Sequence, residues 1–253
     1  MSTDPIGAPI RLVEAGRGAD PLRANTAHHV GDDPGLVADR RAALVAELGR
    51  PIVWMNQTHS ARIALVRRRA EGVVVEVEGV ERSFDPTDAS ALVEADGVVV
   101  DARDWPGAPA AAVMTADCLP VLLSTAGGTI VAAVHAGRRG LFASILTAAV
   151  ARIASLAPGI PIDAYIAPAI CGRCYEVPGA MRDECAAERP ESASITSWGT
   201  PALDLAESAR VELLAAGCRW VAVDPRCTFE DPALHSYRRD SRCGRSAAIV
   251  SPR

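Results

Sequence analysis

The chain has 253 residues, of which 49% are hydrophobic and 23% are charged, and its formal net charge is −5. A chain of this length can bury about 70–75% of its unfolded surface, so its stability should not depend on disulfides. All 26 residues counted as Lys plus Arg are Arg. This excludes a Schiff-base lysine and a P-loop lysine, and any bound anion must be held by Arg, backbone amides or a metal.

The charge pattern also limits the partners. The only basic run is Arg67 to Arg69, whereas nucleic-acid binding requires clustered positive charge. The first thirty residues lack a basic segment followed by an apolar one, and no stretch approaches the roughly 18 apolar residues of a membrane span. We therefore expect a cytoplasmic protein with no nucleic-acid partner and no membrane partner.

Cysteine and histidine counts exclude two further classes. Seven Cys is an odd number, which argues against a disulfide framework in a chain without an export signal. The five His include no His-x-His pair. Because copper favours imidazole ligands, a four-copper oxidase centre needs roughly twice as many histidines. Multicopper laccase chemistry is thus excluded by counting.

In chain order, a loop-rich segment extends to about Gly31. Asp33 and Pro34 then predict the cap and first residue of a helix that ends at Gly49. Tight turns at Glu71-Gly72 and at Gly127-Gly128 predict two hairpins. The predicted strands of this half are 52–55, 63–66, 73–77, 98–100, 110–115, 121–124 and 129–134.

An apolar stripe with helical spacing predicts one continuous helix over 140–156. Asp204 with Glu207 forms a capping-box pattern for a helix ending near Gly217. Strands are predicted at 162–166, 220–223 and 247–250. Because the strands come in runs with helices placed irregularly, we predict an α+β fold with mixed β-sheets and flanking helices, as one domain over 1–253.

Three metal-capable side chains stand at the edges of apolar strands: His59, Cys118 and His135. Cys118 and His135 are close enough in sequence to meet at one end of a sheet, whereas spacing does not decide where His59 lies. Two His and one Cys would leave zinc with an open position, as in catalytic sites. The alternative is a buried cysteine with two unrelated histidines. A third possibility is a Cys118–His135 nucleophilic dyad acting on a carbonyl or amide carbon.

Other candidate groups lie around these residues. The turn after His135 leads directly into a predicted helix, whose N-terminus could attract phosphate, and an ordinary Gly-rich strand-to-helix turn is the alternative. Cys171 and Cys174 form a C-x-x-C motif used by zinc ribbons and thiol oxidoreductases. A structural zinc would need a second cysteine pair, and the other cysteines stand singly, so we interpret these thiols as incidental members of a loop near a pocket.

Polar residues near both ends of the chain offer candidate substrate contacts. Arg239, with Arg238 beside Tyr237, suits bidentate recognition of phosphate or carboxylate, and a solvated turn is the alternative. Arg17 and Asn25 stand in irregular chain, where binding residues are common.

The sequence blocks NQTHSARI, ADGVVVDA, TADCLPVLL, IVAAVHAGRRG, IAPAICGRCYEV and CTFEDPALHSYRRD resemble, in this order, those of the YfiH family. Its members are described as laccase-domain proteins or polyphenol oxidases, as peptidoglycan editing factors and as purine nucleoside phosphorylases. The resemblance spans nearly the whole chain. It departs from the family at Arg138, where Trp is usual, and at His235, where Phe is usual, and it leaves the three metal-capable residues intact.

The resemblance implies an α+β fold related to cysteine-hydrolase-like toxins. It implies that His59, Cys118 and His135 bind zinc, with copper as an alternative metal. The implied activity is phosphorolysis of adenosine, inosine and S-methyl-5′-thioadenosine, together with adenosine deamination. It is compatible with a homodimer.

On these grounds the residues receive roles. Cys118 and His135 are predicted to be catalytic as well as metal ligands, Asp117 is a candidate for proton transfer, and Arg17, Asn25 and Arg239 are candidates for contacts with nucleoside or phosphate. The rivals are a metal-free Cys–His hydrolase or amidase acting on peptidoglycan precursors, a non-enzymatic partner protein, and a copper-dependent polyphenol oxidase side reaction at the same ligands.

Overall fold

The structure is a computed structural model that describes residues 5–88 and 91–253. Its strands are β1 (Ile10–Val13), β2 (Ile52–Met55), β3 (Ile63–Arg69), β4 (Gly72–Val77), β5 (Val80–Ser83), β6 (Leu92–Val93), β7 (Gly97–Asp101), β8 (Ala110–Thr115), β9 (Leu119–Thr125), β10 (Ile130–Ala136), β11 (Ile162–Ile166), β12 (Ala193–Ile195), β13 (Pro201–Leu203), β14 (Trp220–Val223) and β15 (Ser246–Val250). Its helices are α1 (Pro34–Leu48), α2 (Arg138–Phe142), α3 (Ile145–Leu156), α4 (Gly179–Glu188) and α5 (Leu205–Ala215), with 3₁₀ turns at His28–Val30 and Pro190–Ser192.

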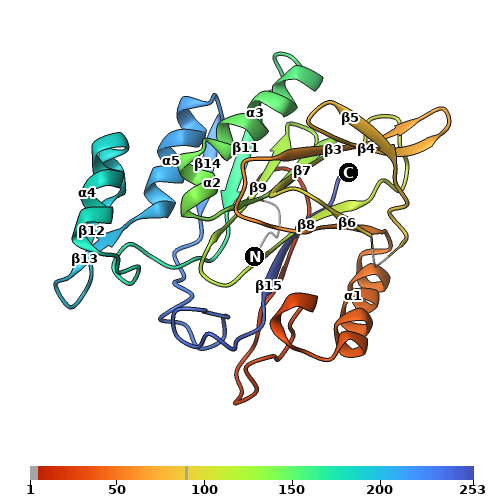
Figure 1. Cartoon of the computed structure of the whole chain (residues 1–253). Helices are drawn as coiled ribbons and strands as arrows, with labels where there is room; N and C mark the ends of the chain where they lie inside the picture. Colours follow the sequence, from red (N-terminus) through yellow and green to blue (C-terminus); the bar gives the residue numbers. More distant parts are fainter. Residues whose placement is uncertain (1–4, 89–90) are drawn as a thin grey trace.

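Two mixed sheets form the centre of the molecule (Figure 1). The larger has the order β14-β11-β9-β10-β7-β3-β4-β5, and the smaller has the order β1-β15-β8-β2-β6. Parallel pairs such as β3 with β7 and β2 with β8 stand among antiparallel ones. The α+β class with mixed sheets and flanking helices is thereby confirmed. No helix among the described residues is long and apolar enough to cross a membrane.

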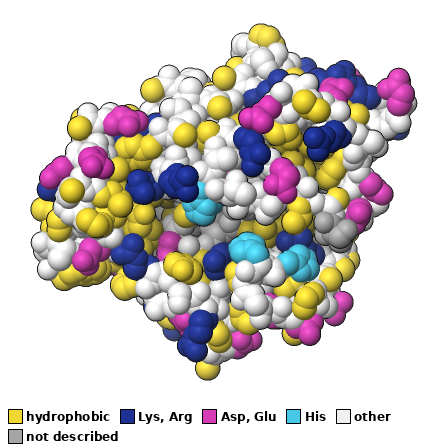
Figure 2. Space-filling model, in the orientation of Figure 1, with side chains coloured by type: hydrophobic (Ala, Val, Ile, Leu, Met, Phe, Trp, Pro, Cys, Tyr) yellow, Lys and Arg dark blue, Asp and Glu magenta, His cyan; other side chains and the backbone are white. Residues whose placement is uncertain are grey.

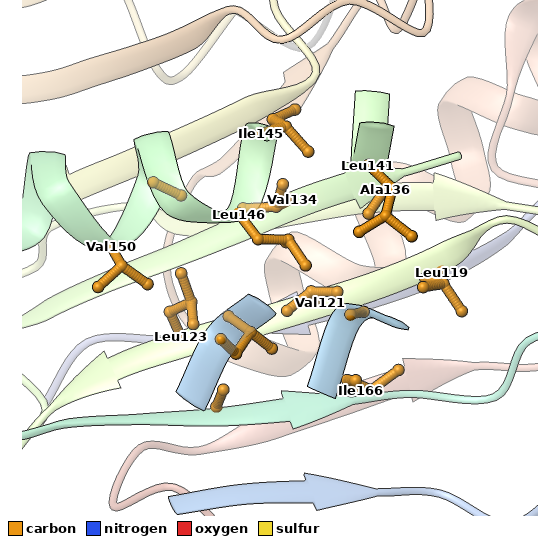
Figure 3. Packing of buried hydrophobic residues seen from close by; sticks show 14 of the residues in the cluster. Leu119, Val121, Leu123, Val134, Ala136, Leu141, Ile145, Leu146, Val150 and Ile166 are labelled. Carbon is orange, nitrogen blue, oxygen red and sulfur yellow. The ribbon is translucent and has the colours of Figure 1, made fainter. Parts of the chain in front are cut away.

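One hydrophobic core lies between the larger sheet and helices α2, α3 and α5. Leu146 and Val150 of α3 extend toward Val121 and Leu123 of β9, as Figure 3 shows, and Ile145 belongs to the same core. Burying side chains of this size removes apolar surface worth about 1.5–3 kcal/mol each, so the apolar stripe that predicted a helix here also fixes its position on the sheet.

A second core lies between the two sheets, and alternation along the strands divides the side chains between these cores. Val131 and Ala133 of β10 face the smaller sheet, whereas Ala132 and Val134 face the helices. His135, the next residue on β10, therefore lies on the side between the sheets, at the end of the strand. A third core packs α1 against the outer face of the smaller sheet.

The prediction of one continuous helix over 140–156 is wrong at one point. The chain breaks at Ser144, whose φ of 58° is left-handed, and two helices, α2 and α3, form instead. The carbonyl oxygen of Leu141 accepts from the Ser144 amide and from the Arg189 guanidinium, both at 2.9 Å. Glu212 accepts from the Thr147 amide at 2.8 Å and so caps the first turn of α3. Tertiary partners therefore supply the hydrogen bonds that a continuous helix would make internally.

Other elements were predicted with mixed success. The two hairpins form as predicted, β3 with β4 and β9 with β10. The Asp204 side chain accepts from the Glu207 amide at 3.0 Å, which confirms the predicted cap of α5. The N-terminal segment predicted to be all loop contains β1, which pairs with β15. Helix α4 was not predicted, because only Cys185 on it is buried and it shows no clear apolar stripe.

Candidate metal centre

The side chains of His59, Cys118 and His135 meet at one edge of the two sheets. One ligand atom from each lies within 4.8 Å of the others. The Cys118 Sγ lies 3.8 Å from His59 Nε2, and the two imidazole rings stand edge to face with centroids 4.6 Å apart. Zinc–ligand bonds of about 2.0–2.3 Å would need only a small contraction of this group. The donor set of two imidazoles and one thiol is one that zinc and copper both accept.

The strand ends explain why the three residues meet. β9 and β10 pair antiparallel, with Ala136 opposite Leu119, so the residues just before β9 and at the end of β10 lie together. His59 stands between β2 and β3, and β3 pairs with β7 next to β10. His59 has a φ of 61°, an uncommon value for a non-glycine residue, and such conformations cluster at functional sites.

Asp96 is the organising residue of this centre, and it is not among the site residues predicted from the sequence. Its carboxylate is fully buried and accepts from His135 Nδ1 at 2.8 Å. It also accepts from the backbone amides of Thr58, His59 and Ser60 and from the Ser60 hydroxyl. Because Asp96 fixes the Nδ1–H tautomer of His135, the Nε2 atom of that ring is left for a metal. The signal that could have identified it is its place in the block ADGVVVDA, which resembles the family.

In the metal-free centre, Cys118 and His135 carry opposite charges at neutral pH. Burial works against an ionised Cys118 thiol, but hydrogen bonds and positive charge from His135 and His59 outweigh it and lower the pKa of the thiol to about 6. Burial likewise opposes charge on His135, yet Asp96 and Cys118 raise the pKa of His135 to about 9. The pKa of Asp96 is held well below its usual range, against the effect of burial, by His135 and Ser60. Cys118 is therefore present as a thiolate at neutral pH, which is the form that binds metals. His135 is protonated at neutral pH, so a metal that binds its Nε2 atom displaces a proton.

Gly137 gives the ligands the space they occupy. A Cβ at this position would lie 2.8 Å from His59 Cδ2 and 3.0 Å from Cys118 Sγ. The φ of Gly137 is −70°, so alanine is compatible with the backbone and only the ligands would have to move.

We predict that Gly137→Ala lowers the affinity for zinc by about 10-fold or more, because displaced ligands no longer meet the required geometry. Competition with a chromogenic chelator measures this affinity. Gly179→Ala is the matched control, since its Cβ would meet only Pro201 Cγ at 3.7 Å. Equal zinc affinities for wild type and Gly137→Ala would contradict this description of the centre.

The three residues open into a cavity of about 550 Å³, a size typical of small-molecule sites. Histidine and arginine side chains gather around a hollow on the face drawn in Figure 2. The cavity lining also includes His29, Gln57, Tyr175, Tyr237, Arg238 and Arg245. Arg238 lies over the Tyr175 ring at 5.3 Å and Arg245 over the Tyr237 ring at 5.7 Å, so each arginine is paired with an aromatic face.

Asp117 lies in the cavity wall, but both of its carboxylate oxygens are engaged. One accepts from the Thr228 hydroxyl at 2.6 Å and the other from the Arg238 amide at 2.7 Å. Asp117 therefore anchors the loop that carries Arg238. Its φ of 89° is a second left-handed conformation beside the metal centre.

The structure does not bring the other predicted substrate contacts to this cavity. Arg17 is exposed and is not among the residues that line it. Asn25 is buried, and its side chain bonds to Ala27 and Asp32 and accepts from the Arg245 amide. The Arg239 guanidinium donates to backbone carbonyls, among them those of Phe229 and Leu234. These hydrogen bonds give Asn25 and Arg239 a structural role. Their contact with substrate stays a prediction.

The two departures from the family blocks have different surroundings. His235 is buried and its Nε2 lies 2.9 Å from the Arg23 carbonyl oxygen. Burial lowers its pKa, so it is neutral at pH 7 and ties the C-terminal loop to the N-terminal segment. Arg138 is the first residue of α2, directly after Gly137.

Comparison with known proteins places this geometry in a family. A family model described as "Multi-copper polyphenol oxidoreductase laccase" matches residues 15–253. A purine nucleoside phosphorylase of Mycobacterium tuberculosis is 41% identical over 230 residues, which cover 89% of this chain and 83% of that protein.

Two solved structures share the fold. Neisseria meningitidis protein NMB0706 has a TM-score of 0.75 and 31% identity, with 97% of this chain and 96% of that chain covered. The Bacillus licheniformis hypothetical protein YfiH has a TM-score of 0.77 and 25% identity, with 100% of this chain and 94% of that chain covered. The resemblance seen in the sequence blocks is thus confirmed, and the chain belongs to the laccase-domain family of the YfiH type.

Proposed function

We propose that this protein is a metal-dependent purine nucleoside phosphorylase that acts on adenosine, inosine and S-methyl-5′-thioadenosine, with adenosine deamination as a second reaction. The observation that carries the proposal is the convergence of His59, Cys118 and His135 in a cavity of about 550 Å³. The proposal is also supported by a relative that aligns with most of the chain and is named a purine nucleoside phosphorylase.

Zinc is the proposed metal, held by His59, Cys118 and His135. A thiolate ligand beside two neutral imidazoles is a common zinc donor set, and three protein ligands leave one position open. When bound, the ion supplies a Lewis acid that polarises phosphate or water and lowers the pKa of a bound water toward about 7. Copper fits the same ligands, and we assign polyphenol oxidation through it to a side reaction. A laccase centre with several coppers is excluded by the five histidines of the chain.

Arg238 and Arg245 supply the positive charge for phosphate in a chain that has no lysine. Tyr175 and Tyr237 offer aromatic faces on which a purine can stack. We assign Asp117 the positioning of the Arg238 loop rather than proton transfer, because its oxygens accept from Thr228 and Arg238.

In phosphorolysis a phosphate oxygen bonds to C1′, the C1′–N9 bond breaks with its electron pair going to the purine, and the purine takes up a proton. The products are the free base and pentose 1-phosphate. In deamination, water adds at C6 and ammonia leaves. The protein contributes to the reaction by holding the phosphate beside C1′, excluding other water and orienting the base. These are effects of proximity and orientation.

A Cys–His hydrolase or amidase acting on peptidoglycan precursors is a second candidate. The observation that favours it is the Cys118 thiol, whose pKa is lowered to about 6 beside His135. Such an enzyme would work in the presence of a chelator and would be inactivated by iodoacetamide whether or not zinc is present.

We propose that the protein is located in the cytoplasm. The seven cysteines of the chain are free thiols, as is usual in a reducing compartment, and this supports the proposed location.

The test is to incubate the zinc-loaded protein with adenosine, inosine or S-methyl-5′-thioadenosine, each with and without phosphate, and to separate the products. We expect free base and pentose 1-phosphate only when phosphate is present, and inosine from adenosine in both conditions. Free ribose without phosphate would indicate a hydrolase instead. The proposal fails if the zinc-loaded wild type yields none of these products.

A further inference from the structure

A second group of metal-capable side chains lies outside the cavity. The sulfur atoms of Cys171, Cys174 and Cys227 and a carboxylate oxygen of Glu230 all lie within 4.8 Å of one another. In a tetrahedral site with Zn–S bonds of about 2.3 Å, neighbouring sulfur atoms are about 3.8 Å apart. We propose that this thiol–carboxylate cluster is a structural zinc site, separate from the centre formed by His59, Cys118 and His135.

The sequence of the two loops has the spacing of a two-turn metal site. Cys171 and Cys174 form C-x-x-C, and Cys227 and Glu230 form C-x-x-E with the same separation. Paired cysteines alone do not reveal this second half, because Glu230 stands where a fourth cysteine would be expected. Zinc accepts carboxylate oxygen as well as thiolate, and Glu230 therefore completes four ligands.

Each half of the cluster is a tight turn, and the two halves touch. The Cys174 amide donates to the Cys171 carbonyl at 3.0 Å, and the Asp231 amide donates to the Cys227 carbonyl at 2.9 Å. The Cys171 amide donates to the Cys227 Sγ at 3.3 Å, and the Cys174 Sγ lies 3.4 Å from Glu230 Oε1. Backbone amides that donate to a ligand sulfur orient it and stabilise its thiolate form, as outer-shell partners of metal ligands do.

The surroundings suit a structural rather than a catalytic ion. Cys174 and Cys227 are buried among apolar side chains, including Ile170 and Phe229. Four protein ligands leave no open position, which distinguishes this cluster from the three-ligand centre in the cavity. The Arg173 guanidinium lies 3.9 Å from the Glu230 carboxylate and offsets part of the negative charge that three thiolates and a carboxylate bring.

The cluster joins two loops that border the cavity. Tyr175 follows Cys174 directly and lines the cavity. Thr228 follows Cys227 and donates to Asp117. Because the binding free energy of a structural zinc adds to folding free energy, the ion would hold this wall of the cavity in place.

The experiment uses the full chain with His59→Ala and Cys118→Ala together, so that metal at the other centre does not contribute. We expect about one tightly bound zinc per chain after dialysis against a weak chelator, measured by inductively coupled plasma mass spectrometry. We expect that cobalt in its place shows thiolate-to-metal charge-transfer bands. Adding Cys174→Ser should abolish both signals, whereas Cys185→Ser, a buried cysteine of α4, should leave them unchanged.

Glu230→Cys keeps the test decisive if Cys174→Ser does not fold. This variant should retain the zinc and give stronger charge-transfer bands, because a fourth thiolate replaces the carboxylate. The proposal is overturned if the His59→Ala and Cys118→Ala chain holds no zinc, if Cys174→Ser retains it, or if thiol titration after denaturation shows a disulfide among these cysteines. None of these outcomes depends on nucleoside phosphorylase activity.

Discussion

Replacing Cys118 with alanine is expected to remove the metal from the cavity and to lower kcat/KM for phosphorolysis by about 10³-fold or more, since losing a Lewis acid costs several kcal/mol of transition-state stabilisation. Cys118 is the only thiol of the three-ligand centre, and its ionised form is the ligand that a soft metal ion favours. His59 and His135 alone leave two neutral ligands, too few for tight binding.

The measurement pairs zinc affinity with the initial rate of free-base release. Cys185→Ala is the matched control, because this cysteine is buried on α4 and does not line the cavity. We expect the control to lose some stability through its cavity and to keep its zinc affinity and its rate. Full activity in Cys118→Ala would show that the metal centre does not take part in the reaction.

Replacing Asp96 with asparagine is expected to lower zinc affinity by about 10–100-fold, the usual effect of removing an outer-shell partner of a metal ligand. The asparagine side chain has nearly the same shape, but it loses the charge and turns one acceptor into a donor. One or more of the partners at Thr58, His59, Ser60 and His135 would then face an N–H group. We also expect a loss of about 3 kcal/mol in the free energy of unfolding, because hydrogen bonds to a buried charge are strong.

Two measurements separate these effects, zinc affinity by chelator competition and stability by urea unfolding of the metal-free chain. Ser60→Ala is the comparison, because it removes one hydrogen bond to the Asp96 carboxylate and leaves the one to His135. It should cost about 1 kcal/mol and leave zinc affinity unchanged. Wild-type zinc affinity in a destabilised Asp96→Asn would restrict Asp96 to a structural role.

Much of the fold could be predicted because the strands are short apolar runs bounded by turn residues. The strands 52–55, 110–115, 162–166 and 220–223 were predicted with the bounds that the structure shows. The break at Ser144 could not be predicted, since its cause is the contact of Arg189 and Glu212 with that part of the chain. The exposed helix α4 carries almost no apolar signal.

Two of the three metal ligands could be placed together from the sequence, because the strands beside them pair locally. Cys118 and His135 adjoin strands joined by a tight hairpin, so their proximity follows from local pairing. The position of His59 depends on the parallel pairing of β3 with β7, which sequence spacing does not reveal. Asp96 and Glu230 were missed because a single carboxylate is an ordinary residue in a loop. Only the folded chain shows that each lies beside metal-capable side chains.

The most direct test of the metal centre is anomalous X-ray diffraction at the zinc edge, on crystals of zinc-loaded wild-type protein that is active in the nucleoside assay. We predict an anomalous peak about 2.0–2.1 Å from the Nε2 atoms of His59 and His135 and about 2.3 Å from the Cys118 Sγ. Active protein whose crystals show no metal between these three residues would contradict the account.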